Sequence, residues 1–311
     1  MTKLIQATRR HPRRWGVLLV LGAMALVVAS NLISAGDVTA QPDGPQQGQP
    51  PPPDIAPASL TPFQTFSSNA DGGTRVVVST HGNVIEFNSP NTAGRDYEHI
   101  AAFSIMEGYV VCYTPSGGAQ RTAIDTEYAE GGFGAATNLT NPVRVNRSTS
   151  DGVLQLNQTF TFNGQNKTLT IKMVLKNKSA APLSDVVLRR VVDFDVDAAG
   201  PDGWTATQNW HTKTYPDSVS AWSDAEDAQN AGKEAHGMVL RHLTQPGGVS
   251  HSPGVLEFLF VSDCVRATHN TPIYGDYADF LAYVIPNLAA GSVQDHQHPV
   301  RAGLEGERRE P

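Results

Sequence analysis

Short runs in which apolar and polar residues alternate recur along most of the chain. The first two, Thr74 to Thr80 (TRVVVST) and Asn83 to Asn88 (NVIEFN), flank the turn His81-Gly82-Asn83 and predict a β-hairpin. Turn sequences such as Asn163-Gly164 and Pro246-Gly-Gly separate the later runs. These later runs span residues 100–105, 108–114, 141–147, 154–162, 169–177, 186–197, 218–222, 236–243, 255–261 and 279–285.

This pattern predicts an all-β fold. About ten to fourteen antiparallel strands in about 230 residues indicate one large antiparallel β-sandwich over residues 63–290. The absence of an internal repeat argues against a propeller. Only Asp224 to Glu234 (DAEDAQNAGKE) has the composition of a helix, and it is too polar for the core. The polar segment 291–311 predicts a disordered tail, in which Asp295, His296 and His298 offer metal-binding groups.

The N-terminus predicts export. Basic residues from Lys3 to Arg14 precede an uncharged apolar run from Trp15 to Ala29, and small residues follow up to Ala40. This order is typical of a signal peptide over residues 1–40, cleaved after Ala40. The alternative is an uncleaved membrane anchor. Residues 41–62 are rich in Pro, Gln and Gly and predict an extended linker to a secreted or cell-surface domain.

Charge narrows the class of partner. The whole chain carries a net charge of −7, and without residues 1–40 it has 18 basic against 29 acidic side chains, or −11. A domain this acidic repels phosphate backbones, so nucleic acid is not an expected partner. Membrane contact is expected only through an uncleaved anchor.

The two cysteines, Cys112 and Cys264, each lie in an apolar run that resembles a strand. In an oxidising compartment we expect them to form a disulfide. Two buried free thiols are the alternative.

Aromatic residues gather in one segment, Pro201 to Pro216 (PDGWTATQNWHTKTYP), and just beyond it. The segment reads as a long loop in which flat rings and amide donors suit stacking and hydrogen bonding to a sugar ring. Alternatively, the rings cover an open end of the sandwich as packing. The predicted ligand-binding residues are Trp204, Trp210, Tyr215, Trp222, Asn209 and His211.

Three carboxylates, Asp193, Asp195 and Asp197, alternate with Phe194 and Val196. In a strand this alternation puts the carboxylates on one face, away from the core. Either a solvated strand face or a bound Ca²⁺ ion would suit them, although the segment lacks the Gly and Glu of an EF-hand loop.

No catalytic motif is present. The histidines show no H-E-x-x-H spacing, and no G-x-S-x-G, Walker A or G-x-G-x-x-G sequence occurs, so no catalytic residue is predicted. His81 is explained as a hairpin residue. An enzyme of the epimerase or lyase type would instead need groups such as Glu98, His99 and His211 to converge on one face.

Residues 154–197, LQLNQTFTFNGQNKTLTIKMVLKNKSAAPLSDVVLRRVVDFDVD, resemble the β-supersandwich modules of carbohydrate-active proteins. The matching elements are two long strands, the Lys-Asn-Lys-Ser turn at 176–179, Pro182-Leu-Ser-Asp-Val186, and strand residues rich in Arg and Asp. The families concerned are the N-terminal domain of family 15 bacterial glucoamylases and, more distantly, galactose mutarotase-like folds. This resemblance implies a supersandwich but no catalytic residue, because those glucoamylases carry their acid and base in a separate helical barrel.

Three functions follow as hypotheses. The first is an exported, non-catalytic β-sandwich that binds a glycan or another cell-surface ligand through the aromatic loop. The second is a carbohydrate-active enzyme of the epimerase or lyase type. The third is a structural envelope protein with no small-molecule site.

Overall fold

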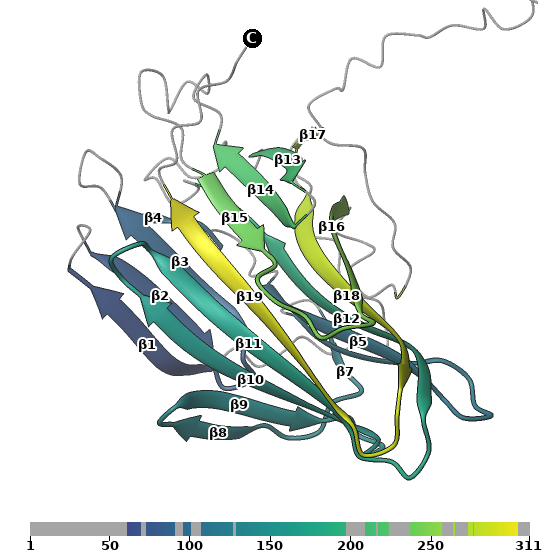
Figure 1. The fold of residues 1–311 in the computed structure, drawn as a ribbon. Coiled ribbons are helices and arrows are strands. Elements are labelled where there is room, and N and C mark those ends of the chain that lie inside the picture. The colour runs from purple at the N-terminus through teal and green to yellow at the C-terminus, as the bar shows by residue number, and fades with distance from the viewer. Residues whose placement is uncertain are drawn as a thin grey trace, which may run out of the picture. The chain divides into compact units, whose positions relative to one another are not determined.

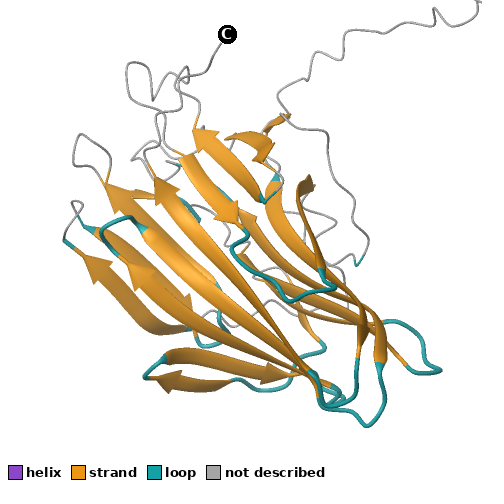
Figure 2. Ribbon diagram, viewed as in Figure 1, coloured by secondary structure: helices purple, strands orange, loops and turns teal. Residues whose placement is uncertain are grey.

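The computed structural model describes residues 61–69, 73–90, 96–100, 107–126, 129–196, 209–215, 217–223, 237–256, 264, 273–275 and 277–303. These residues form strands, turns and loops and include no helix (Figure 2). The predicted all-β sandwich is confirmed. In the described part of the chain no helix long and apolar enough to cross a membrane is found. The predicted signal segment, nearly all of the linker, and the predicted helix at 224–234 lie outside the described residues.

The strands form three antiparallel sheets (Figure 1). The four-stranded sheet has the order β1 (Pro62–Ser68), β2 (Thr74–Ser79), β3 (Val84–Pro90) and β4 (Asp96–Glu98). The six-stranded sheet has the order β16 (Ser250–Leu256), β18 (Ala278–Leu288), β12 (Leu183–Asp193), β5 (Glu107–Pro115), β6 (Arg121–Thr126) and β7 (Ala129–Gly131). The nine-stranded sheet has the order β17 (Ile273–Gly275), β13 (Asn209–Tyr215), β14 (Ser218–Ser223), β15 (Gly237–Arg241), β19 (Val293–Gly303), β11 (Thr168–Asn177), β10 (Leu154–Asn163), β9 (Val143–Ser148) and β8 (Thr137–Thr140).

The hairpin of β10 and β11 follows directly from its sequence. In β11, Leu169, Ile171, Met173 and Leu175 are fully buried and alternate with residues that are only partly buried. An unbroken register joins the two strands from Leu154–Asn177 to Asn163–Thr168. Because period-two alternation buries one face only, this hairpin places its apolar side chains in the core that all three sheets share.

The six-stranded sheet is buried on both faces. On β12, Val186 and Leu188 belong to the shared core, whereas Val187 and Val191 belong to a second apolar cluster. The second cluster contains Cys112 of β5, which forms the predicted disulfide with Cys264 across a Cα–Cα distance of 5.9 Å. Residues 109–113 of β5 (YVVCY) are all buried and form the continuous apolar run that a strand covered on both sides requires.

The prediction of a disordered tail from residue 291 was wrong for residues 293–303. These residues form β19, which pairs with β11 on one side and with β15 on the other. The polar sequence and Pro299 argued against a strand. The structure pairs Pro299 with Thr170. Backbone pairing with β11 and β15 outweighs the low strand propensity of this sequence.

Asp151 ties the turn before β10 to the six-stranded sheet. Its carboxylate accepts hydrogen bonds from Tyr113 Oη at 2.6 Å, from Thr149 Oγ1 at 2.6 Å, from the Val153 N–H at 3.0 Å and from Arg121. Burial alone would raise the pKa of Asp151, but these four donors outweigh it and hold the pKa well below its usual range. The ionised carboxylate therefore stabilises the folded state.

Replacing Asp151 with Asn should lower the free energy of unfolding by about 1–3 kcal/mol at pH 7, because charged hydrogen bonds are lost. Since the folded pKa is depressed, this contribution is present above the ordinary Asp pKa of about 4 and is lost as the pH falls below it. Denaturant unfolding from pH 7 to pH 2 measures the difference between the two proteins. The exposed Asp185, changed to Asn, is the control and should show no such difference. A pH-independent difference at Asp151 would contradict the prediction.

Candidate functional site

The predicted aromatic segment is part of the nine-stranded sheet. Residues 209–215 form β13, so the prediction of a long loop was wrong for them; Trp204 lies outside the described residues. The register places Trp210 opposite Trp222 of β14 and opposite Tyr274 of β17. The positions Tyr274, Trp210 and Trp222, here called the aromatic row, therefore follow one another across three adjacent strands.

His211 marks the inner face of β13. Its side chain is fully buried, and Nδ1 lies 2.9 Å from Oδ1 of Asp279 on β18. Burial raises the pKa of Asp279, although the neighbouring His211 opposes this. His211, predicted to lie in a long loop, is therefore a buried strand residue.

The acidic strand end is not solvated. Asp193 and Asp195 are 4% and 3% exposed, and Phe194 and Val196 are fully buried as well. β12 ends at Asp193, and the N–H of Asp195 donates to the carbonyl of His99 at 2.9 Å. The alternation predicted through residue 197 therefore stops early, and both sets of side chains are covered. Asp197 lies outside the described residues, and Ca²⁺ binding at these carboxylates stays a prediction.

His99, named above as a possible catalytic group, and Glu107 are both buried and make hydrogen bonds to other strands. His99 is buried, and its Nε2 lies 2.7 Å from Ser89 Oγ of β3. Glu107 is buried against Arg190 of β12, whose Nη2 donates to it at 2.7 Å. Burial raises the pKa of Glu107 to about 7, against the opposing charge of Arg190.

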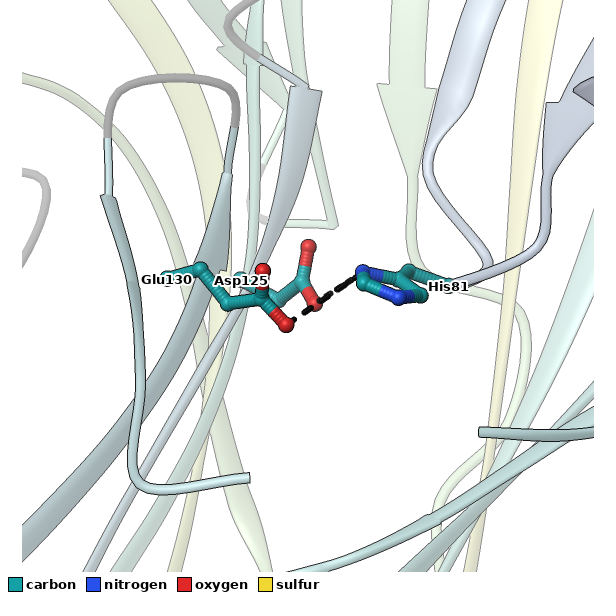
Figure 3. Close-up of side chains that lie close together, drawn as sticks. All are labelled: His81, Asp125 and Glu130. Carbon is teal, nitrogen blue, oxygen red and sulfur yellow. Dashed lines mark ion pairs between the residues drawn. The ribbon is translucent and has the colours of Figure 1, made fainter. Parts of the chain in front are cut away.

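A group of ionisable residues that the sequence did not single out lies where the three sheets meet (Figure 3). It consists of His81, Asp125 and Glu130, here called the His81 cluster. Asp125 of β6 and Glu130 of β7 are directly opposite each other in the register. His81 reaches them from the turn between β2 and β3, with Nδ1 3.2 Å from Asp125 Oδ2 and 3.4 Å from Glu130 Oε1.

Arg147 of β9 completes the electrostatics of this cluster. Its guanidinium pairs with Asp125 and, at 2.9 Å, with Glu130. It also donates two hydrogen bonds to the carbonyl of Gly134 and lies 5.2 Å from the centre of the Phe133 ring. Burial, followed by the charge of Arg147, lowers the pKa of His81, while Glu130 opposes the shift. His81 is therefore held as the neutral imidazole at pH 7.

Sequence patterns could not identify this cluster. Asp125 and Glu130 come together only because β6 and β7 pair, and His81 joins them only when the sheets pack. The His81-Gly82-Asn83 turn was predicted, but a turn sequence does not show which surface it faces.

No protein-family model and no curated protein sequence matches the chain. It is similar to the solved structure of a bacterial glucoamylase complexed with acarbose, with 9% identity and a TM-score of 0.41, over 82% of this chain and 34% of that one. It is similar to a heparan sulfate lyase from Pedobacter heparinus, with 11% identity and a TM-score of 0.40, over 83% and 37%. It is also similar to an aldose epimerase homologue from C. elegans, with 10% identity and a TM-score of 0.40, over 79% and 99%.

The chain thus spans about a third of the length of the first two structures. A glucoamylase and an aldose epimerase homologue are thus among the solved structures to which the chain is similar, and residues 154–197 resemble in sequence the glucoamylase N-terminal domain and, more distantly, galactose mutarotase-like folds.

Proposed function

We propose that this chain is an exported β-sandwich that binds carbohydrate at the aromatic row of Tyr274, Trp210 and Trp222. The strand register is the observation that carries the proposal, because it aligns three aromatic positions across β17, β13 and β14. Flat aromatic faces stack on the apolar faces of sugar rings.

Export is supported by two features. The N-terminal order of basic, apolar and small residues is typical of a signal peptide. The disulfide between Cys112 and Cys264 suits an oxidising compartment.

Substitution of the aromatic row tests the binding proposal. Glycan-array screening of the purified protein identifies a ligand, and affinity electrophoresis then compares Trp210→Ala, Trp222→Ala and Tyr274→Ala with the unchanged protein. Each variant should bind at least about tenfold more weakly, because aromatic residues dominate binding energy at such sites. Phe66→Ala, on the four-stranded sheet, is the control and should bind normally.

Full binding by all three variants would contradict the proposal. A loss found with Trp204→Ala but with none of the three would move the site to the segment before β13. Thermal unfolding of each variant separates a lost contact from a lost fold.

A further inference from the structure

We propose that His81, Asp125 and Glu130 form a binding site for a first-row divalent cation of the zinc type. This site is separate in sequence and in sheet from the aromatic row, so it does not depend on the proposed carbohydrate binding.

Distances between the ligand atoms support this proposal. Zinc binds imidazole nitrogen and carboxylate oxygen at about 2.0–2.2 Å, so two ligands of a tetrahedral site lie about 3.3–3.6 Å apart. In the His81 cluster, Nδ1 of His81 lies 3.2 Å from Oδ2 of Asp125 and 3.4 Å from Oε1 of Glu130. All three ligand atoms lie within 4.8 Å of one another (Figure 3).

Two buried polar atoms in the cluster lack a hydrogen-bond partner among the described residues. They are Nδ1 of His81 and Oδ1 of Asp125, and the Asp125 side chain is 0% exposed. Although Nδ1 is close to both carboxylates, it makes no well-aligned hydrogen bond to either. Buried polar atoms nearly always have a partner. Since a nitrogen and a carboxylate oxygen can both donate a lone pair, a bound cation would serve as the partner of both atoms.

The charges of the cluster indicate the same partner. Asp125 and Glu130 carry two negative charges, and the Arg147 guanidinium carries one positive charge. Arg190 pairs with Glu107. Burial of the remaining negative charge is costly, and a divalent cation between the three ligands would compensate it.

Neighbouring groups hold the ligands in place. Tyr109 Oη donates to the carbonyl of His81 at 2.7 Å, and the Asn83 side chain donates to the carbonyl of Asp125 at 3.1 Å. Arg147 orients both carboxylates as an outer partner of the kind that metal sites commonly have. His81 and Glu130, with side chains 17% and 24% exposed, give the cation access from solvent.

The donor set selects the class of cation. Ca²⁺ takes six to eight oxygen ligands and Mg²⁺ keeps an octahedral shell of oxygens, whereas imidazole nitrogen suits zinc and its first-row neighbours. Three protein ligands leave a fourth tetrahedral position for water or a ligand oxygen.

Metal titration of the purified full chain tests the site. After treatment with a chelator, Zn²⁺ affinity is measured by competition with a chromophoric chelator, and Co²⁺ supplies a visible spectrum that reports coordination geometry. We expect one equivalent of Zn²⁺ to bind per chain, and we expect the spectrum of bound Co²⁺ to be that of tetrahedral coordination. Glu130→Gln and His81→Ala should each weaken Zn²⁺ binding at least about tenfold. Zn²⁺ should raise the melting temperature of the unchanged protein more than that of Glu130→Gln.

Matched controls separate this site from other metal-binding groups. Glu86 resembles Glu130 because it is 23% exposed and pairs with an arginine, Arg75, so Glu86→Gln should bind Zn²⁺ normally. A variant in which His296 and His298 are both Ala should also bind normally.

The proposal would be overturned if the unchanged protein failed to bind one equivalent of Zn²⁺. Unchanged Zn²⁺ affinity in both cluster variants, or weaker Zn²⁺ binding in either control, would also overturn it. If His81→Ala does not fold, Glu130→Gln decides alone, since it keeps the shape of a partly exposed side chain. Glycan binding by the same variants is measured in parallel and should not change.

Discussion

Replacing Arg190 with Met will lower the free energy of unfolding by about 3–5 kcal/mol, as expected when one partner of a buried ion pair is removed. Arg190 is 0% exposed and Glu107 is 1% exposed, and the guanidinium contacts both carboxylate oxygens. It also donates to Gln158 Oε1 at 2.6 Å and to the carbonyl of Gly82 at 3.1 Å. The substitution therefore leaves a buried carboxyl and two acceptors without their donor. Urea unfolding at pH 8, above the folded pKa of Glu107 of about 7, measures the loss.

The exposed pair of Arg75 and Glu86 is the control for this measurement. Arg75 is 50% exposed, so Arg75→Met should cost less than about 1 kcal/mol. Adding Glu107→Leu to Arg190→Met should recover part of the loss, because the unpaired carboxyl is then removed. A loss at Arg190 no larger than that at Arg75 would show that the buried pair does not stabilise the junction of the sheets.

Replacing both Cys112 and Cys264 with Ala will cost about 5 kcal/mol, the chain-entropy value for so long a closed loop. The disulfide joins residues 152 positions apart, and Cys112 is fully buried in the second apolar cluster of the six-stranded sheet. Denaturant unfolding compares the double variant with the oxidised protein. Reduction of the unchanged protein with a thiol should produce a similar loss. A cost below about 1 kcal/mol would mean that the unfolded chain gains little freedom when the bond is broken.

The parts of the fold that could be predicted are those in which the residues next to one another in the sequence also pair. The hairpin of β2 and β3 and that of β10 and β11 combine alternation with a turn sequence, and the structure contains both. β19 could not be predicted, because its pairing partners β11 and β15 are distant in the sequence and its own sequence, VQDHQHPVRAG, has no apolar alternation. The burial of Asp193 and Asp195 was missed for a similar reason, since alternation cannot show where packing covers both faces.

The same distinction applies to the candidate sites. The clustering of Trp210 and Trp222 is visible in the sequence, but the place of Tyr274 beside them depends on the pairing of β17 with β13. The His81 cluster needs His81 from the turn of the four-stranded sheet, Asp125 and Glu130 from the six-stranded sheet, and the guanidinium of Arg147 from the nine-stranded sheet. Local sequence patterns contain no information about such contacts.

The central place of β19 has a consequence for how the chain is made. β11 acquires its first neighbour, β10, as soon as residue 177 is available, but its other edge is closed only by residues 293–303. A chain synthesised from its N-terminus therefore carries an open β11 edge while every intervening segment follows. Insertion of β19 is the step that joins the β8–β11 half of the sheet to the β13–β15 half, so assembly of the nine-stranded sheet is completed only after residue 303 has left the ribosome.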